Sequence, residues 1–561
     1  MKKIKTGAIF LVLTLIVPLV SCLDLTDLNK DPNRPEKVSS NYILTYVLTK
    51  TAINYKALGD FNSQIAGTMQ YIQVGTNESS WKINHYDWDK GSWAAYYDIL
   101  RNVQIINQNA VKEENSLFEA VSLTLRAFLF GIITDNFGDL PYSESLKATD
   151  ELYFPKYDEQ KDIYKGIMED LNRAESLLSG SGISNYSIAA TSDIWFGGNI
   201  AKWRKFTNSL RLRYAMRLYD KKSDMSALGI DVVSIFNDAS SKAISANGEN
   251  AVVKYIGSNS ENSHPGGKLN SSNPQYWRKP CETMVDKLES LNDPRLYRWV
   301  EPVQFKWDYN VTTETTKKVT NMFGDSYDVI YMPTTNTNID TSLYVGLPMG
   351  LAVQDAMNYN KGDYTKAFHS ERSPFISYIH KRYFENVEPL VQIELFMYSE
   401  VEFLLAEAAL KGGFSIQGTA ESHYKNGILA SMNRWNINDG QNGFSFDNYY
   451  NDPKVSYSEA ENKLERIMEQ KWIAGWLTVE TWLDWRRTGY PDLKAGPVAT
   501  YGAALPLRFE YPVPNSDEKY MVNYNAAVER LKPTIYVPSG QSKDHSYSKI
   551  WLIQDTGKPY N

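Results

Sequence analysis

The sequence predicts an all-α, or mainly α-helical, protein in which a helical scaffold carries a loop-rich insertion subdomain. Two observations predict this class. Apolar residues recur at helical spacing up to about residue 220 and again after residue 396. Between these regions the helical spacing fades, and Gly, Pro, Asn, Ser and Thr accumulate. Long loops inside a compact domain are uncommon and tend to carry function, so the middle region is a candidate binding region.

The N-terminal segment is typical of a bacterial lipoprotein signal. Three lysines within the first five residues precede an apolar core over residues 8–20, and small Ser21 is followed by Cys22. The core is too short for a membrane-spanning helix, which needs about 20 apolar residues. We therefore expect residues 1–21 to be removed and Cys22 to carry lipid, which would tether the folded body to a membrane, outside the cytoplasm.

The alternative for this segment is an ordinary secretory signal followed by a stray cysteine.

Residues 22–36 are polar and predict a spacer between the lipid and the folded body. If Cys22 is acylated, Cys281 has no partner for a disulfide, and we interpret it as a small buried residue.

Charge and composition exclude some functions. The formal net charge is −7, and loss of the three signal lysines makes it −10, so the surface would repel nucleic acid and no nucleic-acid partner is expected. The chain contains 14 Trp and 38 Tyr, an excess that needs a reason. Tyr and Trp present a flat apolar face with a polar edge, which suits binding surfaces as well as cores.

Helical spacing in the N-terminal region, residues 37–240, predicts separate packed helices, because Gly, Pro, Asn or Ser clusters bound each run. The predicted helices are Asn41–Tyr55, Trp93–Val111, Phe118–Ile133, Tyr164–Leu178 and Trp203–Leu218. Arginines 204, 211, 213 and 217 of the last helix are expected on a solvated or ion-paired face. The Asp-rich string 135–139 is interpreted as a turn and helix cap rather than a calcium site.

In the insertion, residues 241–395, short alternating stretches at Val252–Ile256 and Tyr327–Tyr331 predict strands, and one helix is expected over Cys281–Leu291.

Helical spacing returns in the C-terminal region, residues 396–561. The helices Tyr398–Ala409 and Thr419–Trp435 carry alanines where they would cross, and the pair resembles one tetratricopeptide unit. A single further helix is predicted over Glu459–Trp485, ending before Gly489 and Pro491. The tail beyond Gly540 is polar and is expected to be coil or edge structure.

Six short strings in order along the chain resemble the SusD/RagB family of nutrient-binding outer-membrane lipoproteins. They are Leu28–Asn33, Asp135–Tyr142, Lys202–Arg213, Asn292–Leu296, Tyr344–Pro348 and Gln470–Pro491. The resemblance implies a core of four tetratricopeptide-like units beneath an irregular insertion. It also implies a SusC-like TonB-dependent transporter as partner, for which the protein captures an oligosaccharide or, alternatively, a peptide. Two acidic residues near Cys22, Asp24 and Asp27, are compatible with export to the outer face.

Two groups of rings are candidates for a ligand platform. The first, Trp81, Tyr86 and Trp88, lies among polar residues in the loop before the second predicted helix. Sugar rings pack their C–H faces on aromatic planes while hydroxyls bond to polar edges, so the mixture suits a glycan. The second group comes from the insertion and consists of Tyr276, Trp277, Trp307 and Tyr309. The alternative for both groups is a packing role.

Enzyme motifs are missing from the sequence: it has no zinc-protease pattern, no G-x-S-x-G elbow and no phosphate-binding loop. We therefore expect a non-catalytic binding protein that needs no cofactor and no metal. Two alternatives stay open. A surface glycoside hydrolase would need two carboxylates that can be far apart in sequence. A structural plug of the transporter would need the helical face but no exposed rings.

Overall fold

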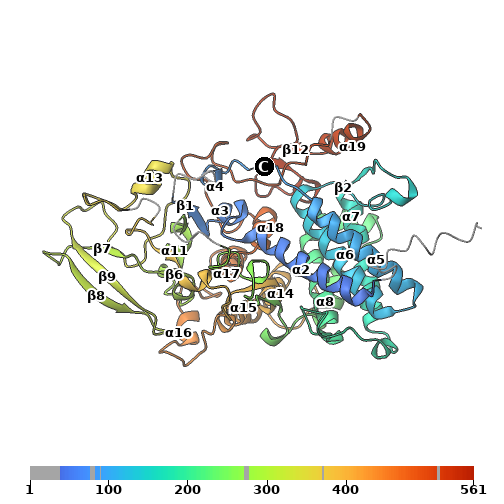
Figure 1. Cartoon of the computed structure of the whole chain (residues 1–561), viewed down its shortest axis with the longest axis horizontal. Coiled ribbons are helices and arrows are strands. Elements are labelled where there is room, and N and C mark those ends of the chain that lie inside the picture. The colour runs from blue at the N-terminus through green and yellow to red at the C-terminus, as the bar shows by residue number, and fades with distance from the viewer. Residues whose placement is uncertain are drawn as a thin grey trace, which may run out of the picture.

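The computed structural model describes residues 38–75, 82–88, 90–270, 277–368, 372–514 and 518–560. Helices dominate these residues, which confirms the predicted fold class (Figure 1). The long helices α5 to α8 lie at one end of the long axis of the molecule, and the strands β7 to β9 of the insertion lie at the other.

The N-terminal scaffold consists of long helices that follow the predicted runs within a few residues. They are α2 (Ser40–Gly59), α5 (Ala94–Lys112), α6 (Ser116–Phe137), α7 (Gln160–Leu178) and α8 (Ile200–Arg217), with the shorter α3 (Gln64–Thr68), α4 (Lys82–His85), α9 (Lys222–Ala227) and α10 (Val232–Ser240). The predictions for the five long helices are confirmed.

Helix α6 is the central helix of this scaffold. The side chain of Asn115 caps its start by accepting a hydrogen bond from the Phe118 amide at 3.1 Å. Its end is fixed by Gly138, which has φ +94°, and a Cβ there would lie 2.8 Å from Ile550. Among the described residues, α6 alone has the length and hydropathy of a membrane span, but 89% of its apolar window is buried inside the protein. It is therefore a core helix.

The C-terminal helices pack against this scaffold. They are α14 (Tyr398–Lys411), α15 (Ala420–Arg434), α16 (Phe446–Tyr450), α17 (Lys463–Ala474), α18 (Glu480–Thr488) and α19 (Glu518–Glu529). The predicted pair α14 and α15 packs closely, since a Cβ on Gly427 would lie 2.9 Å from the Phe403 ring.

The prediction of one helix over Glu459–Trp485 is wrong, because the chain breaks between α17 and α18. Gly475 caps α17, and a side chain there would meet Thr481 at 2.3 Å. Leu477 then adopts a left-handed conformation with φ +58°. The two short helices can consequently face different neighbours.

The insertion contains short strands and little regular helix. Its elements are β4 (Ala251–Lys254), β5 (Arg278–Pro280), α11 (Glu282–Ser290), α12 (Leu296–Trp299), β6 (Val300–Glu301), β7 (Phe305–Asp308), β8 (Thr315–Thr320), β9 (Ser326–Pro333), α13 (Val353–Asn358), β10 (Tyr378–Ile379) and β11 (Gln392–Phe396). The strands β8 and β9 form an antiparallel hairpin, and β7 lies parallel to β9. At the two ends of the insertion, β4 pairs antiparallel with β11.

The segment that follows α18, including the tail beyond Gly540, returns to the N-terminal helices. The Phe509 amide donates to the Asn136 carbonyl at 2.9 Å, and the Leu552 amide donates to the side chain of Gln160 at 2.9 Å. Its only described strands, β12 (Lys532–Pro533) and β13 (Ser548–Lys549), pair with each other, while β2 (Leu140–Pro141) pairs with β3 (Tyr157–Asp158). Beyond Gly540 the expected coil and edge structure are present, and residues 544–550 are buried.

Candidate ligand-binding groove

Part of the predicted first ring group is buried. Tyr86 is 0% exposed and Trp88 is 5% exposed. The Trp88 indole donates to the Thr68 hydroxyl at 3.2 Å and packs on Trp482, with ring centroids 5.0 Å apart. These two side chains therefore do not form an exposed platform in this structure, because both belong to the core, where Trp88 packs against α18. Trp81 lies outside the described residues, as do Tyr276 and Cys22.

Trp307 of the second group is also buried. It is 5% exposed and stacks on Phe375 with an interplanar angle of 8°. Its indole donates to the Asn360 carbonyl at 2.9 Å. Together with Met332 these rings form a small core beneath the β7–β9 sheet, so Trp307 anchors the insertion rather than facing solvent.

Trp277 and Tyr309 keep accessible surface. Tyr309 is 50% exposed at the end of β7, and Trp277 is half-buried. The Trp277 carbonyl accepts a hydrogen bond from the Gly75 amide at 2.9 Å, next to the pairing of β1 (Ile72–Val74) with β5. This pairing brings the flanks of the two predicted ring groups together.

A different group of residues lines a groove of about 530 Å³ where the insertion meets the C-terminal helices. The volume lies within the range of ligand pockets, roughly 300 to 1,000 Å³. The lining residues are Leu291, Asn292, Pro294, Tyr297, Val319, Thr320, Asn321, Met322, Leu343, Tyr344, Gly443, Phe444, Ser445, Asn448, Tyr449 and Asp452. They combine aromatic rings with short polar side chains, as glycan sites do.

A buried hydrogen-bond network holds one wall of the groove. The Asp293 carboxylate pairs with Arg295 at 2.6 Å and accepts from the Tyr449 hydroxyl at 2.7 Å. Arg295 also donates to Gln470 of α17 at 2.8 Å. Because these groups satisfy one another, the turn after α11 is fixed against α16 and α17. Asn292 begins this turn in the left-handed region, with φ +52°.

Rings and free polar groups face the groove. Tyr297 and Tyr344 pack with centroids 5.6 Å apart at 58°, and half-buried Phe444 lies on the C-terminal side. Within the described part of the chain, the hydroxyls of both tyrosines and the side-chain amides of Asn292 and Asn448 make no hydrogen bond to the protein. Tyr344 is only 5% exposed and packs against Tyr297, so the polar groups of Tyr297, Asn292 and Asn448 are the ones accessible to a ligand.

Carboxylates lie behind the two tyrosines. Burial and, to a smaller extent, the charge of Glu289 on α11 raise the pKa of Tyr297, so its hydroxyl stays protonated. Burial raises the pKa of Glu289 itself to about 7, and the nearby carboxylates of Asp286 and Asp340 add to the shift. Carboxyl groups therefore lie near this wall of the groove, and one of them, Glu289, is neutral below about pH 7.

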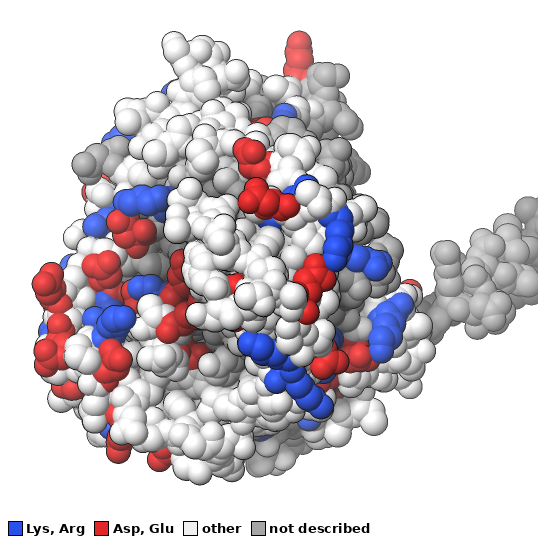
Figure 2. Space-filling model, turned by 90° about the vertical axis from the view of Figure 1, so that its left-hand side faces the viewer, with Lys and Arg blue, Asp and Glu red and all other residues white. Residues whose placement is uncertain are grey.

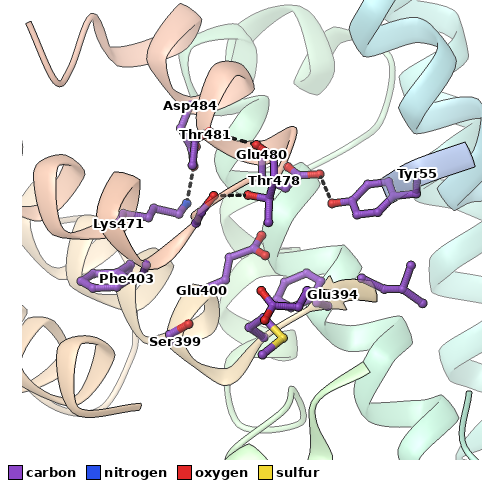
Figure 3. Close-up of a pocket in the computed structure, with 15 residues that line it drawn as sticks. Tyr55, Glu394, Ser399, Glu400, Phe403, Lys471, Thr478, Glu480, Thr481 and Asp484 are labelled. Atoms are coloured by element: carbon purple, nitrogen blue, oxygen red, sulfur yellow. Dashed lines mark hydrogen bonds and ion pairs between the residues drawn. The ribbon is translucent and has the colours of Figure 1, made fainter. Parts of the chain in front are cut away.

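A smaller cavity lies deeper, between α14, α17 and α18 (Figure 3). Its volume of about 40 Å³ has room for only a few water molecules. Glu400 and Glu480 point toward it, yet Arg213 binds both, at 2.7 Å and 3.2 Å. On the far side Lys471 pairs with Asp484 at 2.6 Å. These acids serve an internal ion network, and the cavity is too small for a sugar polymer.

Arg217 extends this network by binding both Asp135 of α6 and Glu480. The predicted ion-paired role of the arginines on α8 is therefore confirmed, but Arg213 and Arg217 are buried rather than solvated. Asp135 is a buried ion-pair partner as well as a residue near the helix end.

Comparison with family models identifies the chain. Residues 32–512 match the SusD-like model described as starch-binding and associating with the outer membrane. The chain belongs to the SusD/RagB family. The resemblance drawn from the sequence is thus confirmed. A comparison with curated protein sequences finds no significant match.

Solved structures of SusD homologues share the fold. A homologue from Bacteroides fragilis NCTC 9343 is 22% identical with a TM-score of 0.71, over 92% of this chain and 100% of that one. A SusD/RagB family protein from Bacteroides thetaiotaomicron VPI-5482 is 22% identical with a TM-score of 0.65, over 92% and 99%. A chitin-binding SusD homologue from Flavobacterium johnsoniae is 20% identical with a TM-score of 0.66, over 91% and 99%.

Sequence reasoning missed the groove of this SusD-like protein. Its rings come from α12, from the segment between β9 and α13, and from the loop before α16, so no local cluster marks them. A weak signal is present in the sequence, since the two strings Asn292–Leu296 and Tyr344–Pro348, which carry part of the family resemblance, both contribute residues to the groove.

Proposed function

We propose that this SusD-like protein captures an oligosaccharide at the cell surface and delivers it to a SusC-like TonB-dependent transporter. The groove between the insertion and the C-terminal helices is the observation that carries the proposal. It provides the half-buried rings of Tyr297 and Phe444 beside polar groups that have no partner in the described protein. A family relative described as chitin-binding supports a carbohydrate ligand.

The chemistry of the groove suits capture without cleavage. Aromatic faces stack on the C–H faces of sugars, and amide and hydroxyl groups orient the sugar hydroxyls. Each such contact contributes modestly, so the ligand can be released to the transporter. A retaining or inverting hydrolase instead needs two carboxyl groups facing the scissile bond, about 5 to 9.5 Å apart. Of the residues that line the groove, only Asp452 carries a carboxylate.

Anchoring through lipid on Cys22 belongs to the same proposal. The acyl chains would hold the mature chain on the outer membrane, next to the transporter that receives the ligand. Replacement of Cys22 by Ser is expected to move the protein from the membrane fraction to the soluble fraction. Co-purification of the native lipoprotein with a transporter from detergent extracts tests the partner.

Calorimetric titration tests the capture function. The full mature chain is titrated with neutral and acidic oligosaccharides and with a peptide digest, and the ligands are then analysed for cleavage. Saturable heat with an intact oligosaccharide is expected. Saturable heat with peptides alone would show that the ligand is a peptide. Shortened sugars would show that the protein is a hydrolase.

Two single variants locate the site. Tyr297→Ala removes a ring from the groove, whereas Tyr309→Ala removes the exposed ring that the sequence predicted. Loss of affinity in the first variant alone assigns binding to the groove. Loss in the second alone assigns it to the loop beyond β7, with Trp277 as the next residue to replace.

A further inference from the structure

The charged side chains in and around the groove bear on which oligosaccharides it can accept. Among the described residues that line it, Asp452 is the single charged side chain, and no Lys, Arg or His is present. Proteins recognise sugar carboxylates and sulfates with cations, because bidentate Arg contacts supply both charge and geometry. The lining offers no such contact.

Three cations close in sequence to the groove are engaged elsewhere, whereas Lys318, next to Val319 on β8, is exposed and does not line the groove. Arg295 is fully buried and paired with Asp293. Arg298 stacks on Phe323, 3.6 Å from the ring centroid, and donates to the Asn436 carbonyl at 3.0 Å. Lys454 donates to the Ser290 carbonyl at 3.2 Å. Moving any of these three toward a ligand would break an existing contact.

Negative charge lies on the same side. Glu289 is close enough to raise the pKa of Tyr297 and, together with other groups, that of Tyr344. Asp286 and Asp340 lie near Glu289 in turn. An anionic sugar would therefore approach these carboxyl groups, which include Glu289 where it is ionised, and no Lys, Arg or His among the described lining residues offsets their charge. Figure 2 shows the side of the molecule that carries the insertion, where uncharged side chains cover most of the surface and charges of both signs are interspersed.

We propose that the groove selects uncharged oligosaccharides and rejects glycans that carry carboxylate or sulfate groups. This inference rests on the proposed capture function and adds the ligand class. Tyr297 and Phe444 provide stacking surface, while Asn292 and Asn448 provide both donors and acceptors, which match neutral hydroxyls. Asp452 accepts hydrogen bonds from hydroxyls but repels anionic substituents.

Titration with matched oligosaccharides tests the inference. The neutral probes are gluco-, manno-, xylo- and N-acetylglucosamine oligomers, and the acidic probes are oligogalacturonate and oligoalginate. We expect saturable binding of at least one neutral series and at least about tenfold weaker binding of the acidic ones at low salt, where charge repulsion is largest.

Groove variants make the test specific. Tyr297→Phe removes only a hydroxyl and Asn448→Ala only an exposed amide, so both are expected to fold and to weaken neutral binding. Tyr42→Ala, at a ring 75% exposed on α2, is the matched control and is expected to bind as the native chain does. Asn448→Lys places a cation in the groove and is expected to improve acidic binding about tenfold. Asn451→Lys adds the same charge on an exposed residue that does not line the groove, and it is expected to change little.

The outcomes separate the two proposals. Acidic oligomers that bind as tightly as neutral ones, and lose affinity in the groove variants, would overturn the neutral selectivity and leave capture intact. Neutral binding that neither Tyr297→Phe nor Asn448→Ala weakens would overturn the groove as the site. Absence of binding by every oligosaccharide would overturn the capture function itself.

Discussion

Replacement of Arg217 by Met should reveal how strongly the internal ion network holds the helices together. Arg217 on α8 binds Asp135 of α6 and Glu480 of α18, and all three side chains are buried. Arg213 still lies 3.2 Å from Glu480 when Arg217 is absent, but Asp135 loses its ion-pair partner. Leaving a buried charge without its partner costs about 3–5 kcal/mol, so we expect a loss of that size in the free energy of unfolding at pH 7.5.

The loss should depend on pH. Burial is the largest influence on the pKa of Asp135 and raises it, while Arg217 is the largest opposing influence. Without Arg217 the folded-state pKa rises further above the unfolded value, so stability is lost as pH increases from the unfolded pKa toward the folded one. The deficit of the variant relative to the native chain should therefore shrink when the pH is lowered from 7.5 to 5.

Urea unfolding followed by circular dichroism measures both effects, and a double variant supplies the decisive control. Asp135→Asn removes the orphaned charge, so Arg217→Met with Asp135→Asn should recover about 2 kcal/mol or more of the loss. If the double variant lost the sum of the two single losses, Arg217 would be acting through packing alone. The reasoning about a buried unpaired carboxylate would then be refuted.

Three further predictions follow from buried groups. Glu289→Gln should raise the melting temperature at pH 8 but not at pH 4.5. The reason is that burial raises the pKa of this carboxyl to about 7, so it destabilises the folded state only where it ionises. Equal shifts at both pH values in differential scanning fluorimetry would contradict this. Cys281 is buried, and burial raises the pKa of its thiol to about 12. Mass spectrometry should therefore find it unmodified by iodoacetamide until urea is added. Rapid labelling of the native protein would contradict its burial. Gly427→Val should cost about 1–3 kcal/mol in urea unfolding, because the new side chain meets the ring of Phe403; a smaller loss would show that α14 and α15 can separate.

Periodicity in the sequence predicted most of the scaffold. The runs behind α2, α5, α6, α7 and α8 are long and keep apolar residues at helical spacing, so this spacing was sufficient to predict them. The break between α17 and α18 was missed because helix formers surround Gly475 on both sides. The helix ends because Leu477 adopts a left-handed conformation, and Gly475 leaves the room that the turned chain needs at Thr481.

The ring predictions show where local composition is insufficient. A tryptophan that faces solvent and one that anchors a loop can have the same polar neighbours in the sequence. Trp307 does the latter, because Phe375, far along the chain, completes a small core against it. Tyr297, Tyr344 and Phe444 were missed for the converse reason, since they meet only when three distant segments converge. Burial is a property of partners that a sequence window does not contain.

The pairing of β4 with β11 has an evolutionary consequence. Val253 faces Ile393 and Lys254 faces Gln392, so the chain leaves the scaffold and returns to it at adjacent points. A segment whose ends are fixed side by side can be lengthened, shortened or exchanged with little effect on the helices below. Proteins that share the scaffold can therefore change the segment between β4 and β11, and with it their ligand specificity, while the helices stay the same.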